Sequence, residues 1–168
     1  LDSGKTTLLA SEATYRASMM PKGKHVLWIN NEERGQKVRL RQIQSALKKS
    51  KEEVFKNVPK AVEEYQDRVG GKDRIIIKDS ASINITEVEK LIKEYPPDLI
   101  IIDQLSKLVS NKGTNQNEAQ RIQALGEKAR QWAKEHCTVI FTIWADGSAE
   151  GEKWIEMNQL YGSKTGVQ

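Results

Sequence analysis

The chain has 168 residues, with 27 Lys and Arg against 23 Asp and Glu, which gives a formal net charge of +4. Hydrophobic residues make up 38% and charged residues 30%, a composition typical of a soluble globular domain and not of a disordered or collagen-like chain. The best apolar run, Leu99–Ile102, is far shorter than the roughly 18 residues of a membrane span, so we expect no membrane partner. The single cysteine, Cys137, excludes an internal disulfide and a Cys-based zinc site, and it favours a cytoplasmic location.

Apolar residues recur at helical and strand spacings that alternate along the sequence. The predicted helices cover residues 8–20, 36–48, 86–94 and 118–135. A further helical segment opens at the capping box of Ser50 and Glu53 and is interrupted by Pro59. The predicted strands cover residues 25–30, 74–78, 98–103 and 138–143, with a polar loop at 110–117 and no clear period after 143. This alternation predicts an α/β domain with a mainly parallel sheet.

The first residues carry the strongest motif, because they match the end of the phosphate-loop pattern G-x-x-x-x-G-K-[ST] at Asp2-Ser3-Gly4-Lys5-Thr6-Thr7. Gly4 permits close backbone approach to phosphate, and the N–H groups at the start of the following helix attract an anion. Lys5 is expected to reach the β and γ oxygens of a nucleoside triphosphate, and the Thr6 hydroxyl to ligate Mg²⁺. The alternative is a helix-initiating turn that matches by chance, and the downstream features favour the phosphate loop.

The predicted strand at residues 98–103 ends in an aspartate, in the sequence Leu99-Ile-Ile-Ile-Asp103. Ligands of parallel sheets bind at the carboxyl ends of the strands, so we expect Asp103 to lie beside the phosphate loop and to hold Mg²⁺ through water. The alternative is a solvated Asp at a strand end. Gln104 comes next, and an amide cannot accept a proton from water, so a general base must come from elsewhere.

The sequence Asn30-Asn31-Glu32-Glu33 offers two carboxylates at the end of another predicted strand. One of them could orient or deprotonate an attacking water, and we favour Glu32 as the catalytic base. The alternative is an acidic N-terminus that stabilises the dipole of the following helix.

In order and spacing these motifs resemble the RecA-like ATPase domain of hexameric replicative DNA helicases of the DnaB type, including bacteriophage versions. The matching features are the phosphate loop, the strand that leads to Glu32, the segment Asp79-Ser-Ala-Ser82, and Pro96-Pro-Asp-Leu-Ile-Ile-Ile-Asp103. The resemblance covers nearly the whole chain. It implies a single RecA-like P-loop domain over residues 1–168, with helices on both faces of the sheet.

The resemblance also implies a motor that hydrolyses ATP or another NTP with Mg²⁺ and translocates on single-stranded DNA. Lys5 and Glu32 would be catalytic, and Thr6 and Asp103 would hold the metal ion. The full-length protein would be a homo-oligomer, a hexameric ring with primase as a possible partner, in the host's cytoplasm if it is viral. The DNA-contacting positions that the resemblance implies are Asn111, Lys112, Asn115, Lys153 and Lys164.

Three departures from the family pattern accompany the resemblance. The strand at 138–143 runs into Trp144, where the family usually places a Gln or His that senses the γ-phosphate. The first glycine of the phosphate loop and its strand are expected before Leu1, and the arginine finger after Gln168. We therefore expect these 168 residues alone to be a truncated domain that is monomeric and binds nucleotide weakly.

Two other functions share most of these features. A RecA-like recombinase or signalling ATPase would have the same fold, and an inactive RecA-like module would bind nucleotide or DNA without turnover. The basic residues between Arg34 and Lys51 are either a nucleic-acid or subunit contact or a solvated helix face, and we favour the solvated face.

Overall fold

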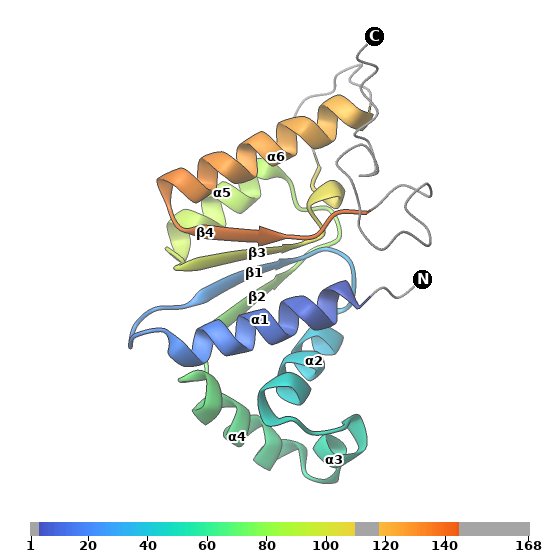
Figure 1. Cartoon of the computed structure of the whole chain (residues 1–168), viewed down its shortest axis with the longest axis vertical. Coiled ribbons are helices and arrows are strands. Elements are labelled where there is room, and N and C mark those ends of the chain that lie inside the picture. The colour runs from blue at the N-terminus through green and yellow to red at the C-terminus, as the bar shows by residue number, and fades with distance from the viewer. Residues whose placement is uncertain (1–3, 110–117, 145–168) are drawn as a thin grey trace, which may run out of the picture.

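The computed structural model describes residues 4–109 and 118–144, and these form one parallel sheet with helices on both faces (Figure 1). The strands are β1 (Val26–Asn30), β2 (Ile75–Asp79), β3 (Leu99–Asp103) and β4 (Thr138–Phe141), in the spatial order β2-β1-β3-β4. Every neighbouring pair is parallel, and the register sets Asn30 opposite both Asp79 and Asp103. The predicted α/β fold with a parallel sheet is confirmed.

The helices begin and end close to their predicted bounds. They are α1 (Lys5–Met19), α2 (Gly35–Leu47), α3 (Lys51–Lys56), α4 (Val58–Val69), α5 (Ile85–Glu94) and α6 (Glu118–Glu135), with a short 3₁₀ turn, η1, at Leu105–Lys107. The Ser50 capping box starts α3 as predicted, and Pro59 lies in the first turn of α4, where a missing N–H does no harm. The first helix was expected at residue 8 but begins at Lys5, because Gly4 takes a left-handed conformation with φ of 72° and serves as its N-cap.

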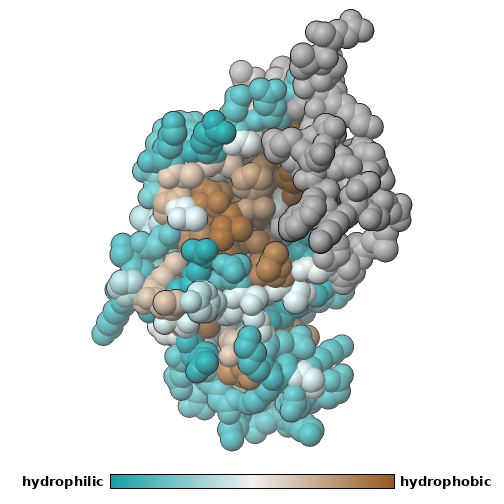
Figure 2. Space-filling model, viewed as in Figure 1, coloured by the Kyte–Doolittle hydropathy of each residue, from teal (hydrophilic) through white to brown (hydrophobic). Residues whose placement is uncertain are grey.

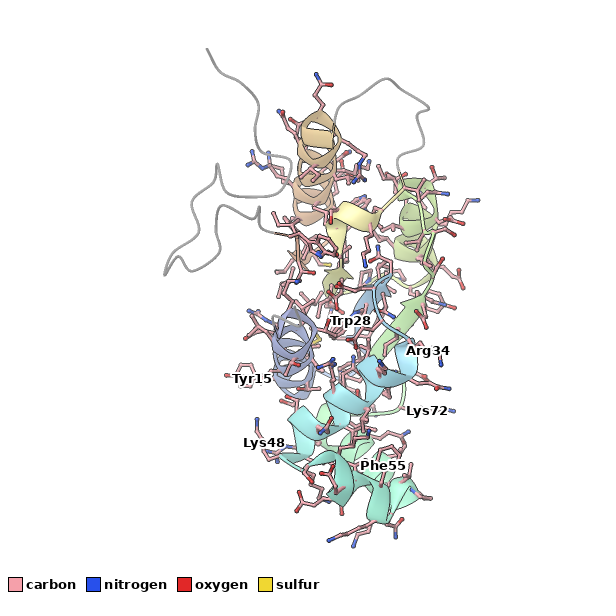
Figure 3. All side chains as sticks on the ribbon, turned by 90° about the vertical axis from the view of Figure 1, so that its right-hand side faces the viewer. Tyr15, Trp28, Arg34, Lys48, Phe55 and Lys72 are labelled. Carbon is pink, nitrogen blue, oxygen red and sulfur yellow. The ribbon has the colours of Figure 1, made fainter. Side chains whose placement is uncertain are left out.

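Two apolar clusters hold the layers together. One joins α1, α2 and α4 to one face of the sheet and includes Trp28, which lies between the sheet and these helices (Figure 3). The other joins α5, α6 and η1 to the opposite face and includes Trp132. The β1 and β3 strands are buried along their full length, as their continuous apolar runs require in a sheet that is covered on both faces.

The β4 strand is only partly covered. Its residues are half-buried or exposed, and 39% of Phe141 is accessible to solvent. Figure 2 shows the resulting apolar surface between α6 and α1. In the described parts of the chain no helix is long and apolar enough to cross a membrane.

Candidate nucleotide site at the carboxyl edge of the sheet

The start of α1, which carries the described phosphate-loop residues Gly4 to Thr7, meets Asp103 at the edge where the parallel strands end, and this edge faces the viewer in Figure 3. The Thr6 hydroxyl, in the first turn of α1, donates a hydrogen bond of 2.8 Å to Asp103 Oδ2. Lys5 is the first residue of the same helix. Gly4 has open space around the position that a Cβ would take, but its positive φ disfavours any side chain. Asp2 and Ser3 lie outside the described residues.

Asp103 is fully buried, and both of its carboxylate oxygens accept hydrogen bonds from threonine hydroxyls. The second donor is Thr142, which follows β4 and lies 2.8 Å from Asp103 Oδ1. A buried carboxylate needs such donors, because its transfer from water is otherwise very unfavourable. Sequence reasoning missed Thr142, although a hydroxyl residue at the end of an otherwise apolar strand was a usable signal.

The loop that carries the two glutamates begins directly beside Asp103. The Asn31 amide N–H donates to the Asp103 carbonyl oxygen at 2.9 Å, and the Asn31 side chain bonds both backbone polar groups of Gln104. Lys5, Thr6, Asp103 and Glu32 therefore belong to segments that meet at one edge of the sheet.

The two glutamates have different partners. The Glu33 carboxylate is held by the Arg41 guanidinium, with a shortest distance of 2.9 Å. Glu32 Oε1 lies 3.7 Å from the Lys107 ammonium, a looser contact, and 22% of the Glu32 side chain is exposed. Glu32 is therefore the less constrained carboxylate of the two.

The geometry and the donor set suit a Mg²⁺–nucleotide complex. Thr6 and Asp103 place a hydroxyl and a carboxylate oxygen side by side, and Mg²⁺ is commonly held by one or two carboxylates together with phosphate and water oxygens. Among the described residues there is no group of three or more His, Cys, Asp or Glu that could form an all-protein metal cage. Gln104 and Asn30 are fully buried at the same edge with side-chain amide atoms that lack a hydrogen-bond partner in the described structure.

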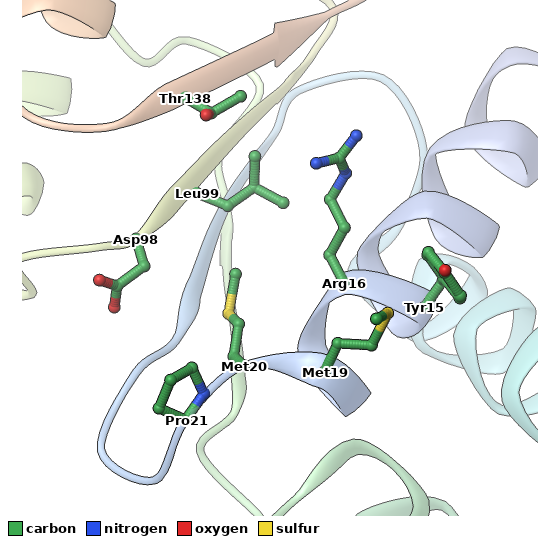
Figure 4. A pocket seen from close by; sticks show the side chains of 8 residues that line it. All are labelled: Tyr15, Arg16, Met19, Met20, Pro21, Asp98, Leu99 and Thr138. Atoms are coloured by element: carbon green, nitrogen blue, oxygen red, sulfur yellow. The ribbon is translucent and has the colours of Figure 1, made fainter.

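A hollow at the opposite edge of the sheet lies away from these residues. Figure 4 shows it between the end of α1 and the starts of β3 and β4, with a volume of about 400 Å³. Its lining contains Asp98, whose desolvation is outweighed by the hydrogen bond and charge of Lys24, so that the pKa of this carboxyl is lowered. This hollow is not part of the candidate site, because it lies at the other edge of the sheet from Thr6 and Asp103.

The remaining predicted positions are described only in part. Trp144 follows β4 and is 48% exposed, with the Lys107 ammonium 5.8 Å from the centre of its ring. The predicted DNA contacts all lie outside the described residues; they are Asn111, Lys112, Asn115, Lys153 and Lys164. In the basic segment, Arg39 bonds Tyr65 and the Ile75 carbonyl, Arg41 bonds Glu33, and Lys49 pairs with Glu64.

One protein-family model matches most of the chain, including the segments that form this site. The model of the AAA domain family matches residues 2–143, which include the phosphate loop, the Glu32 loop and Asp103. The chain belongs to the AAA domain family. No curated protein sequence matches it.

Two solved structures show the same fold as this AAA domain. The first, described as an ATPase domain, superposes with a TM-score of 0.75 at 18% identity, over 96% of this chain and 61% of that one. The second, a DnaB-like replicative helicase described with its interactions with primase, superposes with a TM-score of 0.76 at 18% identity, over 96% of this chain and 42% of that one. The chain thus spans less than two thirds of the length of these structures. The resemblance to the RecA-like domain of DnaB-type helicases is confirmed at the level of the fold.

Proposed function

We propose that this domain hydrolyses ATP, or another NTP, as the motor of a DnaB-type replicative helicase that translocates on single-stranded DNA. The observation that carries the proposal is the hydrogen bond between Thr6 of the phosphate loop and the buried Asp103, with the Glu32 loop beginning at the Asp103 carbonyl. Three separate segments that each match an NTPase motif meet at the edge where ligands of parallel sheets bind.

Each of these residues has a distinct part in the proposed reaction. The N–H groups at the start of α1 and the Lys5 ammonium would bind the phosphates, and Thr6 and Asp103 would hold Mg²⁺. The bound ion would supply charge that stabilises the phosphate oxygens during transfer. The Glu32 carboxylate would orient the attacking water and accept its proton.

The remaining parts of the proposal concern the whole protein. On the resemblance to DnaB-type helicases, the full-length protein would be a homo-oligomer, a hexameric ring with single-stranded DNA in its channel. One structural neighbour is described with its interactions with primase, which supports primase as a possible partner. ATP turnover would then move the DNA-contacting loops in sequence.

The test is steady-state ATP hydrolysis by the complete protein with and without single-stranded DNA. Lys5→Ala should lower kcat by roughly 100-fold or more, because it removes the positive charge that would stabilise the transferring phosphate. Lys22→Ala is the matched control, since Lys22 is exposed near the opposite edge of the sheet. Glu32→Gln should retain bound nucleotide and lower turnover by about 100- to 10,000-fold. Its control is Glu94→Gln, on the exposed end of α5, which should leave turnover unchanged.

The outcomes separate the parts of this proposal. ATPase activity that DNA does not stimulate would contradict the translocase, and activity that survives Lys5→Ala would contradict the whole site. Turnover that is undiminished in Glu32→Gln would move the base to another residue. Tight nucleotide binding without any turnover would instead favour an inactive RecA-like module.

A further inference from the structure

The loop between β1 and α2 is held to its surroundings at both ends and in the middle. At its ends, Asp79 accepts hydrogen bonds of 2.7 Å from the Asn30 side chain and from the Gly35 amide. A Cβ at position 35 would lie 2.9 Å from Asp79 Oδ2, so these segments approach as closely as glycine permits. These contacts fix the ends of the loop but leave its glutamates to be oriented by other groups.

In the middle of the loop, the Glu33 carboxylate accepts hydrogen bonds from the guanidinium of Arg41 on α2. One terminal nitrogen of Arg41 lies 2.9 and 3.2 Å from the two carboxylate oxygens, and Nε lies 3.3 Å from one of them. The fork of an arginine side chain fixes the direction of a carboxylate as well as its distance. The two side chains are 24% and 23% exposed, so water competes only partly for this pair.

The other terminal nitrogen of Arg41 reaches the phosphate-loop helix. It donates a hydrogen bond of 2.8 Å to the hydroxyl of Thr7, the residue that follows Thr6. A single rigid group therefore joins the two halves of the candidate site, one that would bind phosphate and one that carries Glu32.

We propose that Arg41 is a positioning residue that sets the place of the Glu32 carboxylate relative to the phosphate loop through its bonds to Glu33 and Thr7. This role rests on the proposed ATPase function. It also assigns Glu33 to the support of the loop and leaves Glu32 as the reacting carboxylate. Displacement of a reacting group by about 1 Å can lower a rate by about 100-fold, so the link matters for turnover more than for binding.

The test compares Arg41→Gln and Arg41→Lys with the matched control Lys37→Gln in the complete protein. Lys37 is an exposed basic residue of the same helix. Arg41→Gln should lower kcat by roughly 10- to 100-fold, with the Kd for ATP changed by no more than about twofold. Arg41→Lys should restore little of the loss, because lysine keeps the charge but not the fork. The double variant Glu33→Gln with Arg41→Gln should lower kcat by no more than either single change does.

Amide hydrogen exchange provides a readout that does not depend on activity. Arg41→Gln should speed exchange at residues 31–35 and leave it unchanged in β3, because the loop loses a tether while the sheet keeps its ladder. Unchanged kcat in an active protein would overturn the proposal, and so would a large loss of ATP affinity at constant kcat, which would make Arg41 a nucleotide ligand. If the wild-type protein hydrolyses no NTP, the proposed function fails, and unchanged exchange at residues 31–35 would then reject the positioning role separately.

Discussion

At the scale of single residues, Asp103 shows how a charged group can be buried at a strand end. Its carboxylate takes one hydroxyl donor from α1 and one from the segment after β4, so elements on both sides of β3 contribute to its environment. Buried polar groups that lose a partner keep the full desolvation penalty, so each of these threonines should matter for stability as well as for the site.

Thr142→Val keeps the shape of the side chain and removes the donor to Asp103 Oδ1. We expect the free energy of unfolding to fall by about 1–3 kcal/mol, measured by urea denaturation. Thr138→Val is the control, because Thr138 is exposed at the start of the same strand. Equal effects of the two substitutions would show that the Asp103 contact contributes nothing.

At the scale of elements, α5 illustrates how local sequence sets a helix start. The Asn84 side chain accepts from the Glu87 amide at 3.0 Å, and the Glu87 carboxylate accepts from the Asn84 amide at 2.8 Å. This reciprocal pair satisfies two amide groups that have no partner inside the helix. The amphipathic pattern of residues 86–94 predicted the helix, and the capping box explains why it begins one residue earlier.

Asn84→Ala removes the cap while leaving the backbone free to keep its bridge to Val109. The expected loss is about 1 kcal/mol in the free energy of unfolding, measured by chemical denaturation. Lys90→Ala, on the exposed face of the same helix, should leave the midpoint unchanged. A loss in Lys90→Ala as large as in Asn84→Ala would mean that the helix, and not its cap, was weakened.

At the scale of the whole molecule, the two apolar clusters bury groups whose ionisation then affects the stability of the fold. Burial, with the nearby Asp98 carboxylate adding to it, raises the pKa of the Cys137 thiol to about 11. Burial also raises the pKa of the Tyr65 hydroxyl, and the Arg39 guanidinium opposes that shift. Both groups hold their protons more tightly in the folded chain than in the unfolded chain.

The free energy of unfolding should therefore fall in alkaline solution. The contribution of Cys137 is fully present below the ordinary thiol pKa of about 8.5 and is lost as pH rises towards 11, because the unfolded chain releases the proton first. Urea midpoints of the wild type and of Cys137→Ala, measured between about pH 8 and 10.5, check this. The variant should lose less stability over that range, and parallel curves for the two proteins would contradict the expectation.

Several parts of this protein follow from its sequence alone. The continuous apolar runs of β1 and β3 require burial on both faces, and the Gly-Lys-Thr turn before an apolar helix predicts an anion-binding helix start. Parallel strands end at one edge, so the sequence also predicted that Thr6, Asp103 and Glu32 belong to segments that meet. These inferences need only periodicity, turn chemistry and the rule that ligands bind where parallel strands end.

Only the tertiary structure decided which side chains contact one another at that edge. The Thr142 bond to Asp103, the Asn31 bonds to Gln104, and the Arg41 link from Glu33 to Thr7 join residues that are far apart in sequence. No local pattern encodes them, because each depends on strand order, register and the angle at which α2 packs beside α1. In the sequence, Arg41 is one of several basic residues in its segment. Only the fold places its guanidinium between Glu33 and Thr7.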